Sequence, residues 1–450
     1  MKIIQRPSKI FDCVLPKPSV ETGNYVPSVF NFFQEYNHTV LFNTLTRCFA
    51  CIEKNDKEVL NQNTIFVDAA NCNSALKELI ELRFLVPEGF DEIALYEEIY
   101  ETKYIMMQKE GIRLYKIFTT TACNARCFYC FEQGIEVATM NDKTTDALFE
   151  YIMKTKKDGT VKLYWFGGEP LCNHRTIYRI CEMLRDAGVD YASDIVSNGS
   201  LFTQQMIQDA VKLWNLKTCQ ITLDGMKEEY ERRKNYKGGF PNAFETVVEN
   251  IRLLLDAGVR VQIRMNLDIK NIDSILQLKD FLKEQFGHYP NVTIYPAMIY
   301  EAWFGYSDEQ SKEQRALLLD AWEHTKEIVD AEELRSKSKL DTNLPMWYCM
   351  ANSPTCVVVD PRGRLFTCQN YDEKMCYGDI WNGITNREVF DSWKHNGHPQ
   401  EKCKKCALLP ECTAFNKCPT AQYNCFSQRK DRLERKLKNA YSRFQNREES

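Results

Sequence analysis

Three closely spaced cysteines in the first half of the chain have the residue type and the spacing to bind an iron–sulfur cluster. Cys123, Cys127 and Cys130 are separated by three and then by two residues. Three thiolates ligate three irons of a 4Fe-4S cube and leave one iron open, whereas clusters that only transfer electrons usually have four cysteines. The triplet therefore predicts a cluster that is completed by a substrate or a cofactor. A zinc site is the alternative, but structural zinc sites need four ligands and no histidine lies nearby.

Composition and charge exclude several classes of protein. The chain has 450 residues, with 58 basic against 62 acidic side chains and a net charge of −4, which gives no electrostatic argument for a nucleic-acid partner. No apolar run approaches the roughly 18 residues of a membrane span, and the first residues lack a signal-peptide core. We therefore expect a cytoplasmic protein. Its 19 cysteines are then metal ligands or thiols rather than a disulfide framework.

Strand and helix patterns alternate in the middle of the chain. The predicted strands are Leu114–Thr120, Val161–Phe166, Tyr191–Ser197, Thr218–Leu223, Val259–Leu267 and Val292–Ala297. The predicted helices are Thr144–Lys156, His174–Ala187, Thr203–Trp214, Asn242–Ala257 and Ile272–Phe286. This α/β order implies a parallel sheet with right-handed crossovers, as a doubly wound sheet or a partial barrel. In both folds ligands bind at the carboxyl ends of the strands.

Polar and glycine-rich motifs follow these predicted strands. The cysteine triplet follows the first strand, and Gly167-Gly168-Glu169-Pro170 follows the second. The third strand ends in Ser197-Asn198-Gly199, the fourth in Thr222-Leu223-Asp224, and the fifth contains Arg264 near its end. Paired glycines allow the backbone to approach a ligand closely. Each motif alone is weak, but together they predict one pocket.

Residues from about 112 to 300 resemble the radical S-adenosylmethionine (SAM) superfamily. In that family the triplet binds a 4Fe-4S cluster whose open iron chelates SAM. The resemblance implies that Glu169 and the Gly167–Gly168 backbone bind the methionine amine, and that Tyr129 packs near the adenine. The other side chains expected at the SAM site are Ser197, Asn198, Thr222, Arg264 and Lys234, with Arg233 as a second basic candidate.

The same resemblance implies a fold and a reaction. The family fold is a partial (β/α)6 barrel of the TIM type, which fits six predicted strands better than a doubly wound sheet does. One-electron reduction of SAM gives methionine and a 5′-deoxyadenosyl radical, which abstracts hydrogen from the substrate.

The cysteines of the C-terminal part resemble the SPASM extension, which binds two auxiliary 4Fe-4S clusters. The resemblance assigns one cluster to Cys349, Cys356, Cys368 and Cys418, and the other to Cys403, Cys406, Cys412 and Cys425. The chain would then bind three [4Fe-4S] clusters and SAM. Five residues separate Cys412 from Cys418 where the family usually has three, so the first auxiliary cluster could instead have an open iron. Zinc ribbons are the alternative use of these cysteines.

SPASM enzymes mostly modify peptides or proteins, which narrows the predicted function. In the branch that converts Cys or Ser of sulfatases to formylglycine, an aspartate base follows the cysteine that matches Cys368. Here Gln369 follows, and an amide is not a useful base. The favoured prediction is a maturase that installs a thioether or carbon–carbon cross-link in a ribosomally made precursor peptide. A formylglycine-forming or other SPASM dehydrogenase is the alternative. A flavodoxin- or ferredoxin-type protein is the expected reductant, and an electron carrier would need no SAM pocket.

We expect five regions along the chain. Residues 1–105 are predicted to form a small α+β, winged-helix-like domain with a hairpin at Thr39–Glu53 and helices at Ala75–Phe84 and Asp91–Glu101. Such a domain resembles leader-peptide recognition modules, which pair with an extended peptide at a sheet edge, although a simple cap is nearly as good an interpretation. The further regions are the radical SAM core at 106–305, a helical bridge at 306–345, the SPASM domain at 346–428 and a charged, solvated helix at 429–450.

Overall fold

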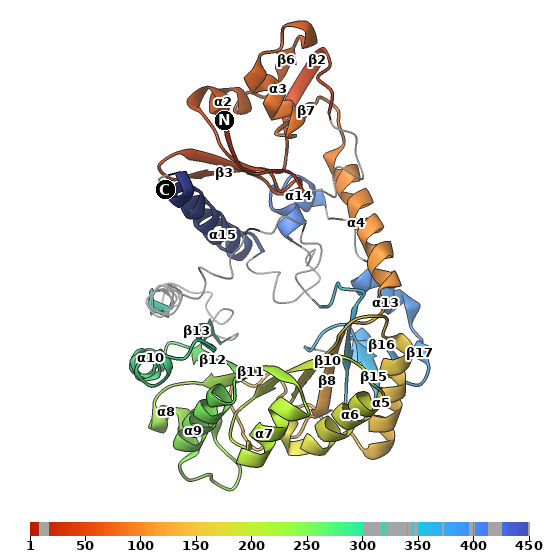
Figure 1. The fold of residues 1–450 in the computed structure, drawn as a ribbon, viewed down its shortest axis with the longest axis vertical. Helices are drawn as coiled ribbons and strands as arrows, with labels where there is room; N and C mark the ends of the chain where they lie inside the picture. The colour runs from red at the N-terminus through yellow and green to blue at the C-terminus, as the bar shows by residue number, and fades with distance from the viewer. Residues whose placement is uncertain are drawn as a thin grey trace. The chain divides into compact units, whose positions relative to one another are not determined.

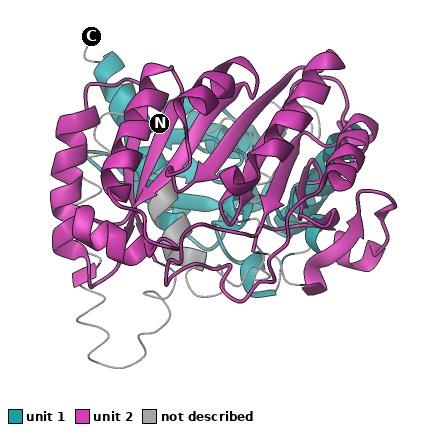
Figure 2. Ribbon diagram, turned by 90° about the horizontal axis from the view of Figure 1, so that it is seen from below, with its two compact units in different colours: residues 1–109, 336–353, 393–450 teal, residues 110–335, 354–392 magenta. Residues whose placement is uncertain are grey.

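The computed structural model describes residues 1–8, 18–299, 317–318, 320–321, 340, 344, 350–370, 373–395, 399, 401–412 and 425–448. These residues form two compact units, shown in Figure 2. The first unit contains residues 1–109, 336–353 and 393–450, and the second contains 110–335 and 354–392. The predicted SPASM region therefore contributes to both units. Cys349, Cys418 and nearly all of the predicted bridge lie outside the described residues.

A parallel sheet with helices between its strands is the centre of the second unit (Figure 1). Its strands are β8 (Leu114–Thr120), β9 (Val161–Gly167), β10 (Tyr191–Ser197), β11 (Leu216–Leu223), β12 (Arg260–Leu267) and β13 (Val292–Met298). They lie in the order β13-β12-β11-β10-β9-β8, and the neighbouring strands are parallel. The helices are α5 (Asp142–Thr155), α6 (His174–Asp186), α7 (Gln204–Lys212), α8 (Lys227–Lys234), α9 (Ala243–Asp256) and α10 (Ile272–Phe286), with the 3-10 helix η2 (Pro170–Asn173). The predicted partial barrel is thereby confirmed, and among these helices α8 and the short η2 were not expected from the sequence.

Alternation along the strands separates the hydrophobic core from the site. In β9, Val161, Leu163 and Trp165 are buried in a core that also includes the apolar faces of the helices. Lys162 and Tyr164 alternate with them and are more accessible. Because successive side chains of a strand point to opposite faces, the other face of the sheet presents the polar side chains.

The C-terminal cysteine-rich segment extends the sheet of the barrel. Strand β14 (Cys356–Val359) pairs in parallel with β8, with Cys356 opposite Leu114. The strands β15 (Arg364–Phe366), β16 (Cys376–Asp379) and β17 (Gly383–Ile384) follow in antiparallel order. The 3-10 helix η3 (Glu373–Met375) and helix α13 (Arg387–Lys394) complete this segment. The sheet therefore has ten strands in the described part of the chain.

The described residues of the first unit form two small sheets. One has the order β1-β5-β4-β3 and the other has the order β6-β2-β7. The strands are β1 (Lys2–Gln5), β2 (Gly23–Pro27), β3 (Asn31–Glu35), β4 (Thr39–Asn43), β5 (Phe49–Cys51), β6 (Ile65–Val67) and β7 (Leu85–Pro87). The helices are α2 (Lys54–Leu60), η1 (Ala69–Asn71), α3 (Ser74–Glu81), α4 (Glu92–Lys109), α14 (Glu401–Lys404), η4 (Leu409–Glu411) and α15 (Cys425–Glu448). The predicted hairpin is the antiparallel pair of β4 and β5, and α3 and α4 are the two predicted helices.

The C-terminal helix α15 has one buried face, which differs from the solvated helix expected from its charge. Leu433, Leu437 and Tyr441 are buried in a cluster with Phe42 and Phe49 of the N-terminal sheet. Their spacing of four residues places them on one side of a helix. The many Lys and Arg residues between them masked this stripe in the sequence.

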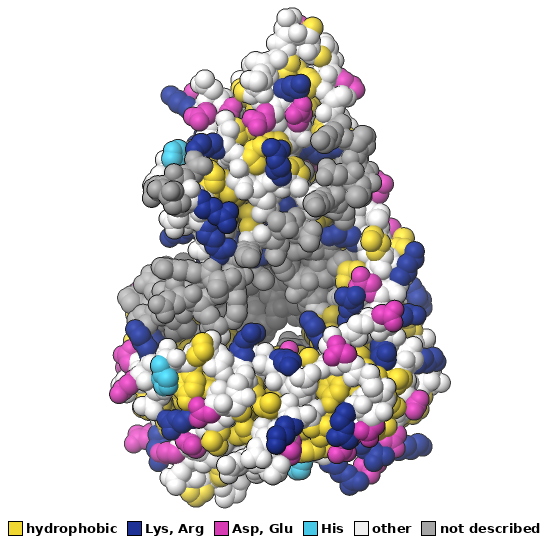
Figure 3. Space-filling view, in the orientation of Figure 1, with side chains coloured by type: hydrophobic (Ala, Val, Ile, Leu, Met, Phe, Trp, Pro, Cys, Tyr) yellow, Lys and Arg dark blue, Asp and Glu magenta, His cyan; other side chains and the backbone are white. Residues whose placement is uncertain are grey.

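No described helix is long and apolar enough to cross a membrane. On the face shown in Figure 3, acidic and basic side chains are interspersed over the outer surface of the barrel unit, in agreement with the near balance of charges in the sequence.

Candidate active site

The three cysteines of the triplet lie on the loop that follows β8. Cys127 and Cys130 are joined by a backbone hydrogen bond of 3.1 Å. The loop is also held from outside: the Asn198 side chain donates to Asn124 Oδ1 at 2.7 Å, and the Arg126 amide donates to the Lys234 carbonyl at 2.8 Å. All three thiols are partly exposed, so they are accessible to a bound group.

Gly167 and Gly168 are required by close packing against the start of this loop. Gly167 has φ +121°, and a Cβ there would lie 2.2 Å from the Thr120 carbonyl oxygen. A Cβ on Gly168 would lie 2.4 Å from the carbonyl oxygen of Ala122. The Gly168 amide already donates to Thr120, at 3.0 Å. The glycines therefore hold the cysteine loop on the sheet, and their contact with SAM stays a prediction.

Glu169 is fully buried and its carboxylate joins two strand ends. It accepts hydrogen bonds from Ser197 Oγ at 2.9 Å, from the Asn198 amide at 2.7 Å and from the Leu171 amide at 3.1 Å. Burial raises its pKa to about 7, and these donors partly offset that effect. In the described structure Glu169 and Ser197 therefore contact each other, and their contacts with SAM stay predictions.

A buried polar network lies at the carboxyl end of β11. Lys234 Nζ lies 2.6 Å from Thr222 Oγ1, 3.1 Å from Tyr129 Oη and 3.1 Å from Asp224 Oδ2. Tyr129 also donates to Asp224 Oδ2. Burial is the largest single influence on the pKa of Lys234 and would lower it. The neighbouring acidic groups, of which the Asp224 carboxylate has the strongest effect, together hold that pKa well above its usual value.

Asp224 is the member of this network that sequence reasoning missed. It stands inside a motif that marks the end of a strand, but only the fold shows its partners. Its side chain is fully buried and its Oδ1 has no hydrogen-bond partner. A buried acceptor without a partner is unfavourable unless a ligand supplies a donor.

The two adjacent basic residues have different environments. Arg233 forms a two-pronged ion pair with Asp268, at 2.9 and 2.8 Å, and also contacts Glu229. The structure therefore brings Lys234, and not Arg233, to Tyr129 and Thr222. Arg264 lies opposite Thr222 in the β11–β12 register, and its buried Nε has no hydrogen-bond partner.

These observations fit an iron–sulfur cluster with a small polar cofactor. Three accessible thiols lie on one loop, and an unpaired acceptor and an unpaired donor are buried at the ends of neighbouring strands. Among the described residues, no three side chains of His, Cys, Asp or Glu are already gathered in a metal-binding arrangement. The fit of a cluster and a cofactor to this site therefore rests on the chemistry of these side chains and on their position at the same edge of the sheet.

The predicted auxiliary ligands are divided between the units. Cys356 and Cys368 are in the barrel unit, at the beginning of β14 and just after β15. Cys403 lies in α14, Cys406 follows that helix and Cys412 follows η4, all within one segment of the first unit. Cys425 is the first residue of α15.

Gln369 contacts the concave face of the barrel. Its Oε1 accepts a hydrogen bond from Lys116 of β8. Lys116 Nζ also lies 4.2 Å from the centre of the Tyr164 ring and 4.0 Å from that of Phe166. The amide next to Cys368 is therefore engaged with a cation.

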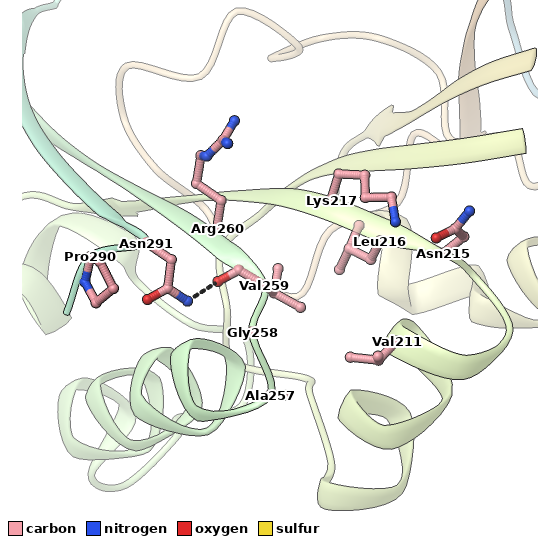
Figure 4. Close-up of a pocket in the computed structure, with 10 residues that line it drawn as sticks. All are labelled: Val211, Asn215, Leu216, Lys217, Ala257, Gly258, Val259, Arg260, Pro290 and Asn291. Carbon is pink, nitrogen blue, oxygen red and sulfur yellow. Dashed lines mark hydrogen bonds between the residues drawn. The ribbon is translucent and has the colours of Figure 1, made fainter. Parts of the chain in front are cut away.

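A pocket of about 340 Å³ lies at the opposite edge of the sheet, where strands β11 to β13 begin (Figure 4). It is lined by Asn215, Lys217, Arg260 and Asn291 among others, and the Asn291 amide donates to the Val259 carbonyl at 2.9 Å. None of the predicted site residues lines this pocket. In barrels of this kind that end contributes to stability rather than to catalysis.

Comparison with known proteins assigns the class of this barrel. Residues 117–282 match the model of the radical SAM superfamily, so the chain contains a radical SAM domain. The protein is accordingly an enzyme, and such a domain implies a 4Fe-4S cluster and SAM as cofactors. The radical SAM cyclopropyl synthase TigE of Paramaledivibacter caminithermalis is 28% identical over 172 residues. That match covers 34% of this chain and only 36% of TigE.

Two solved structures have the same fold over much longer stretches. The structure of anSMEcpe with bound AdoMet covers 74% of this chain and 98% of its own, with a TM-score of 0.53 and 16% identity. Streptococcus suis SuiB bound to precursor peptide SuiA covers 88% of this chain and 96% of its own, with a TM-score of 0.50 and 15% identity. Both likenesses extend well beyond residues 117–282.

Proposed function

We propose that the protein is a peptide maturase that installs a thioether or carbon–carbon cross-link in a ribosomally made precursor peptide. The main support is the architecture: the cysteine-rich segment continues the sheet of the radical SAM barrel, with β14 beside β8. The likeness to SuiB, which was solved with its precursor peptide, covers 88% of this chain and is therefore not confined to the barrel.

In this proposal Cys123, Cys127 and Cys130 hold the 4Fe-4S cluster at the barrel. Tyr129 and the network of Lys234, Thr222 and Asp224 line the SAM site. The free Asp224 Oδ1 is suited to accept from a hydroxyl or an ammonium group of SAM. When bound, the reduced cluster and SAM together supply the radical that removes hydrogen from the substrate.

Forming a cross-link removes two hydrogen atoms from the peptide. One leaves as a hydrogen atom, and the other leaves as a proton and an electron. We propose that the cysteines of the C-terminal part hold two auxiliary clusters, one of which accepts that electron. A flavodoxin- or ferredoxin-type protein would supply the first electron, in the cytoplasm.

The alternative product is formylglycine, and the likeness to anSMEcpe, also solved with a peptide, keeps that reaction in view. Gln369 favours the cross-link. Its amide has no useful basicity, and its oxygen accepts from Lys116. Position 369 therefore lacks the proton acceptor that an aspartate supplies in the formylglycine-forming branch.

The N-terminal part is proposed to capture the leader of the precursor. The sheet β6-β2-β7 has β6 at one edge, and Phe66 of that strand is 68% exposed. An extended peptide can pair with such an edge and place a side chain on the exposed ring.

The test is reaction of the anaerobically reconstituted enzyme with precursor peptides encoded beside its gene. A cross-linked product loses two hydrogen atoms, resists fragmentation between the joined residues and does not react with a hydroxylamine probe for aldehydes. An aldehyde in the product would establish the alternative. Unchanged peptides together with SAM cleavage would contradict the peptide substrate.

A further inference from the structure

The segment of residues 401–412, which includes α14 and η4, contains three predicted auxiliary ligands and packs on the N-terminal part of the same unit. Its central leucines enter two different apolar clusters. Leu409 packs with Phe30 and Tyr96, and Leu408 packs with Phe42 and Phe49. Cys403 borders the first of these clusters and Cys406 borders the second. The position of residues 401–412 therefore depends on their packing against the N-terminal part of this unit.

A buried ion pair fixes one end of this segment. Arg47 contacts Glu411, the neighbour of Cys412, although the two residues are 364 positions apart in sequence. The side chains are 0% and 7% exposed. Thr44, three residues before Arg47, also donates its hydroxyl to the Ala407 carbonyl. Breaking a buried ion pair on one side leaves an uncompensated charge, which makes such contacts strong constraints on position.

Arg47 occupies an unfavourable backbone conformation. It lies in the turn between β4 and β5 with φ 67°, a left-handed value that disfavours side chains with a Cβ. Its guanidinium lies 4.7 Å from the centre of the Phe42 ring. The side-chain contacts thus retain an arginine where the backbone alone would favour glycine or asparagine.

A second cation lies close to Arg47. Lys103 of α4 donates to the Leu344 carbonyl at 2.9 Å. Burial and the charge of Arg47 lower the pKa of Lys103 to about 8. Cysteine thiolates on iron bring negative charge, and the reduction potential of a cluster depends on the charges and hydrogen bonds around it.

We propose that Arg47 is a positioning residue for the auxiliary cluster held by Cys403, Cys406 and Cys412. Through Glu411 it fixes the segment of residues 401–412. Its guanidinium also neutralises the Glu411 carboxylate beside Cys412, which keeps the reduction potential of the cluster higher than it would be beside an unpaired carboxylate. The inference rests on the proposed function in one respect, namely that these cysteines ligate an iron–sulfur cluster.

The test is a redox titration of the full-length, anaerobically reconstituted holoenzyme followed by EPR, together with iron analysis. The signal of this cluster is identified by its loss in Cys412→Ala. Arg47→Met is expected to lower the midpoint potential of that signal and to reduce the iron content. Arg47→Lys keeps the charge and should restore the potential toward the wild-type value. Arg83→Met is the matched control, because Arg83 also has a positive φ, of 60°, and lies near Glu92.

Equal potentials in Arg47→Met and wild type would overturn the inference, as would an equal shift in Arg83→Met. If Arg47→Met fails to fold, Lys103→Met replaces it, since Lys103 lies in a helix and needs no left-handed backbone. Its smaller shift in the same direction would support the charge effect, and no shift would overturn it. A wild-type chain with only about four irons, and no signal lost in Cys412→Ala, would overturn the auxiliary clusters themselves.

Discussion

Lys234 Nζ lies 3.1 Å from Asp224 Oδ2, and their side chains are 2% and 0% exposed. This buried pair joins the end of α8 to the end of β11, directly beside the loop of the three cysteines. A buried pair of charges does not by itself indicate a gain in stability, because both ions lose their hydration. The free Oδ1 of Asp224 instead suggests that the pair is prepared for a ligand.

Asp224→Asn should destabilise the apoprotein by about 3 kcal/mol, because it leaves the Lys234 ammonium buried without its counter-ion. Thermal or denaturant unfolding measures this change. The double variant Asp224→Asn with Lys234→Met should recover much of the lost stability, yet bind SAM weakly. Recovery of SAM affinity in the double variant would show that the pair has only a structural role.

Tyr129→Phe removes one hydroxyl from the same network while it keeps the ring. We expect SAM affinity to fall by about 1 kcal/mol, which is roughly five-fold, with iron content unchanged. Isothermal titration of the reconstituted enzyme with SAM measures the affinity. Arg233→Lys is the control, because Arg233 pairs with Asp268 and Glu229; an equal loss of affinity there would contradict the placement of the SAM site.

Glu169→Gln tests whether the buried carboxylate binds SAM or only joins strand ends. The folded-state pKa of about 7 lies above the ordinary 4.5, so the contribution of Glu169 to stability is present below about pH 4.5 and is lost as the pH rises through 7. Relative to Glu169→Gln, the wild type should lose about 3 kcal/mol over this interval. Denaturant unfolding at several pH values gives the difference. If Glu169→Gln also lowers the affinity for SAM about ten-fold or more, the carboxylate contacts the cofactor directly.

Replacing Cys123, Cys127 and Cys130 by alanine should remove about four of about twelve irons per chain and abolish SAM cleavage. Iron and sulfide analysis after anaerobic reconstitution checks the first number, and chromatography of 5′-deoxyadenosine checks the second. Zinc in the anaerobically purified protein at the C-terminal cysteines would instead support zinc ribbons.

Phe66→Glu places a charge on the exposed edge strand β6. We expect a higher KM for the full-length precursor peptide, because leader capture raises the effective concentration of the substrate at the site. The KM of a leaderless core peptide and the uncoupled cleavage of SAM should not change. This substitution is a better test than deletion of residues 1–105. The deletion would also remove Arg47 and the apolar side chains against which residues 401–412 pack. If Phe66→Glu and the wild type have equal KM values for the precursor, the edge of β6 does not bind the leader and the N-terminal part is a cap.

The sequence alone determined the barrel and the cysteine triplet. The strands β8 to β13 and the α-helices between them, except α8, follow from their periodic apolar patterns, and parallel strands place their carboxyl ends along one edge. Cys123, Glu169 and Thr222 could therefore be assigned to one region without coordinates. These are local patterns combined with one general rule of topology.

Only the tertiary structure decided which side chains meet there. Lys234, and not Arg233, reaches Tyr129 and Thr222, because adjacent side chains at the end of α8 point in different directions. The sequence could not show this, since α8 has no clear apolar stripe from which its orientation could be predicted. The contact of Arg47 with Glu411 joins residues 364 positions apart, and no local pattern encodes such a pair. Periodicity in sequence reports which face of an element is buried, whereas the partner on that face is fixed by the packing of the whole chain.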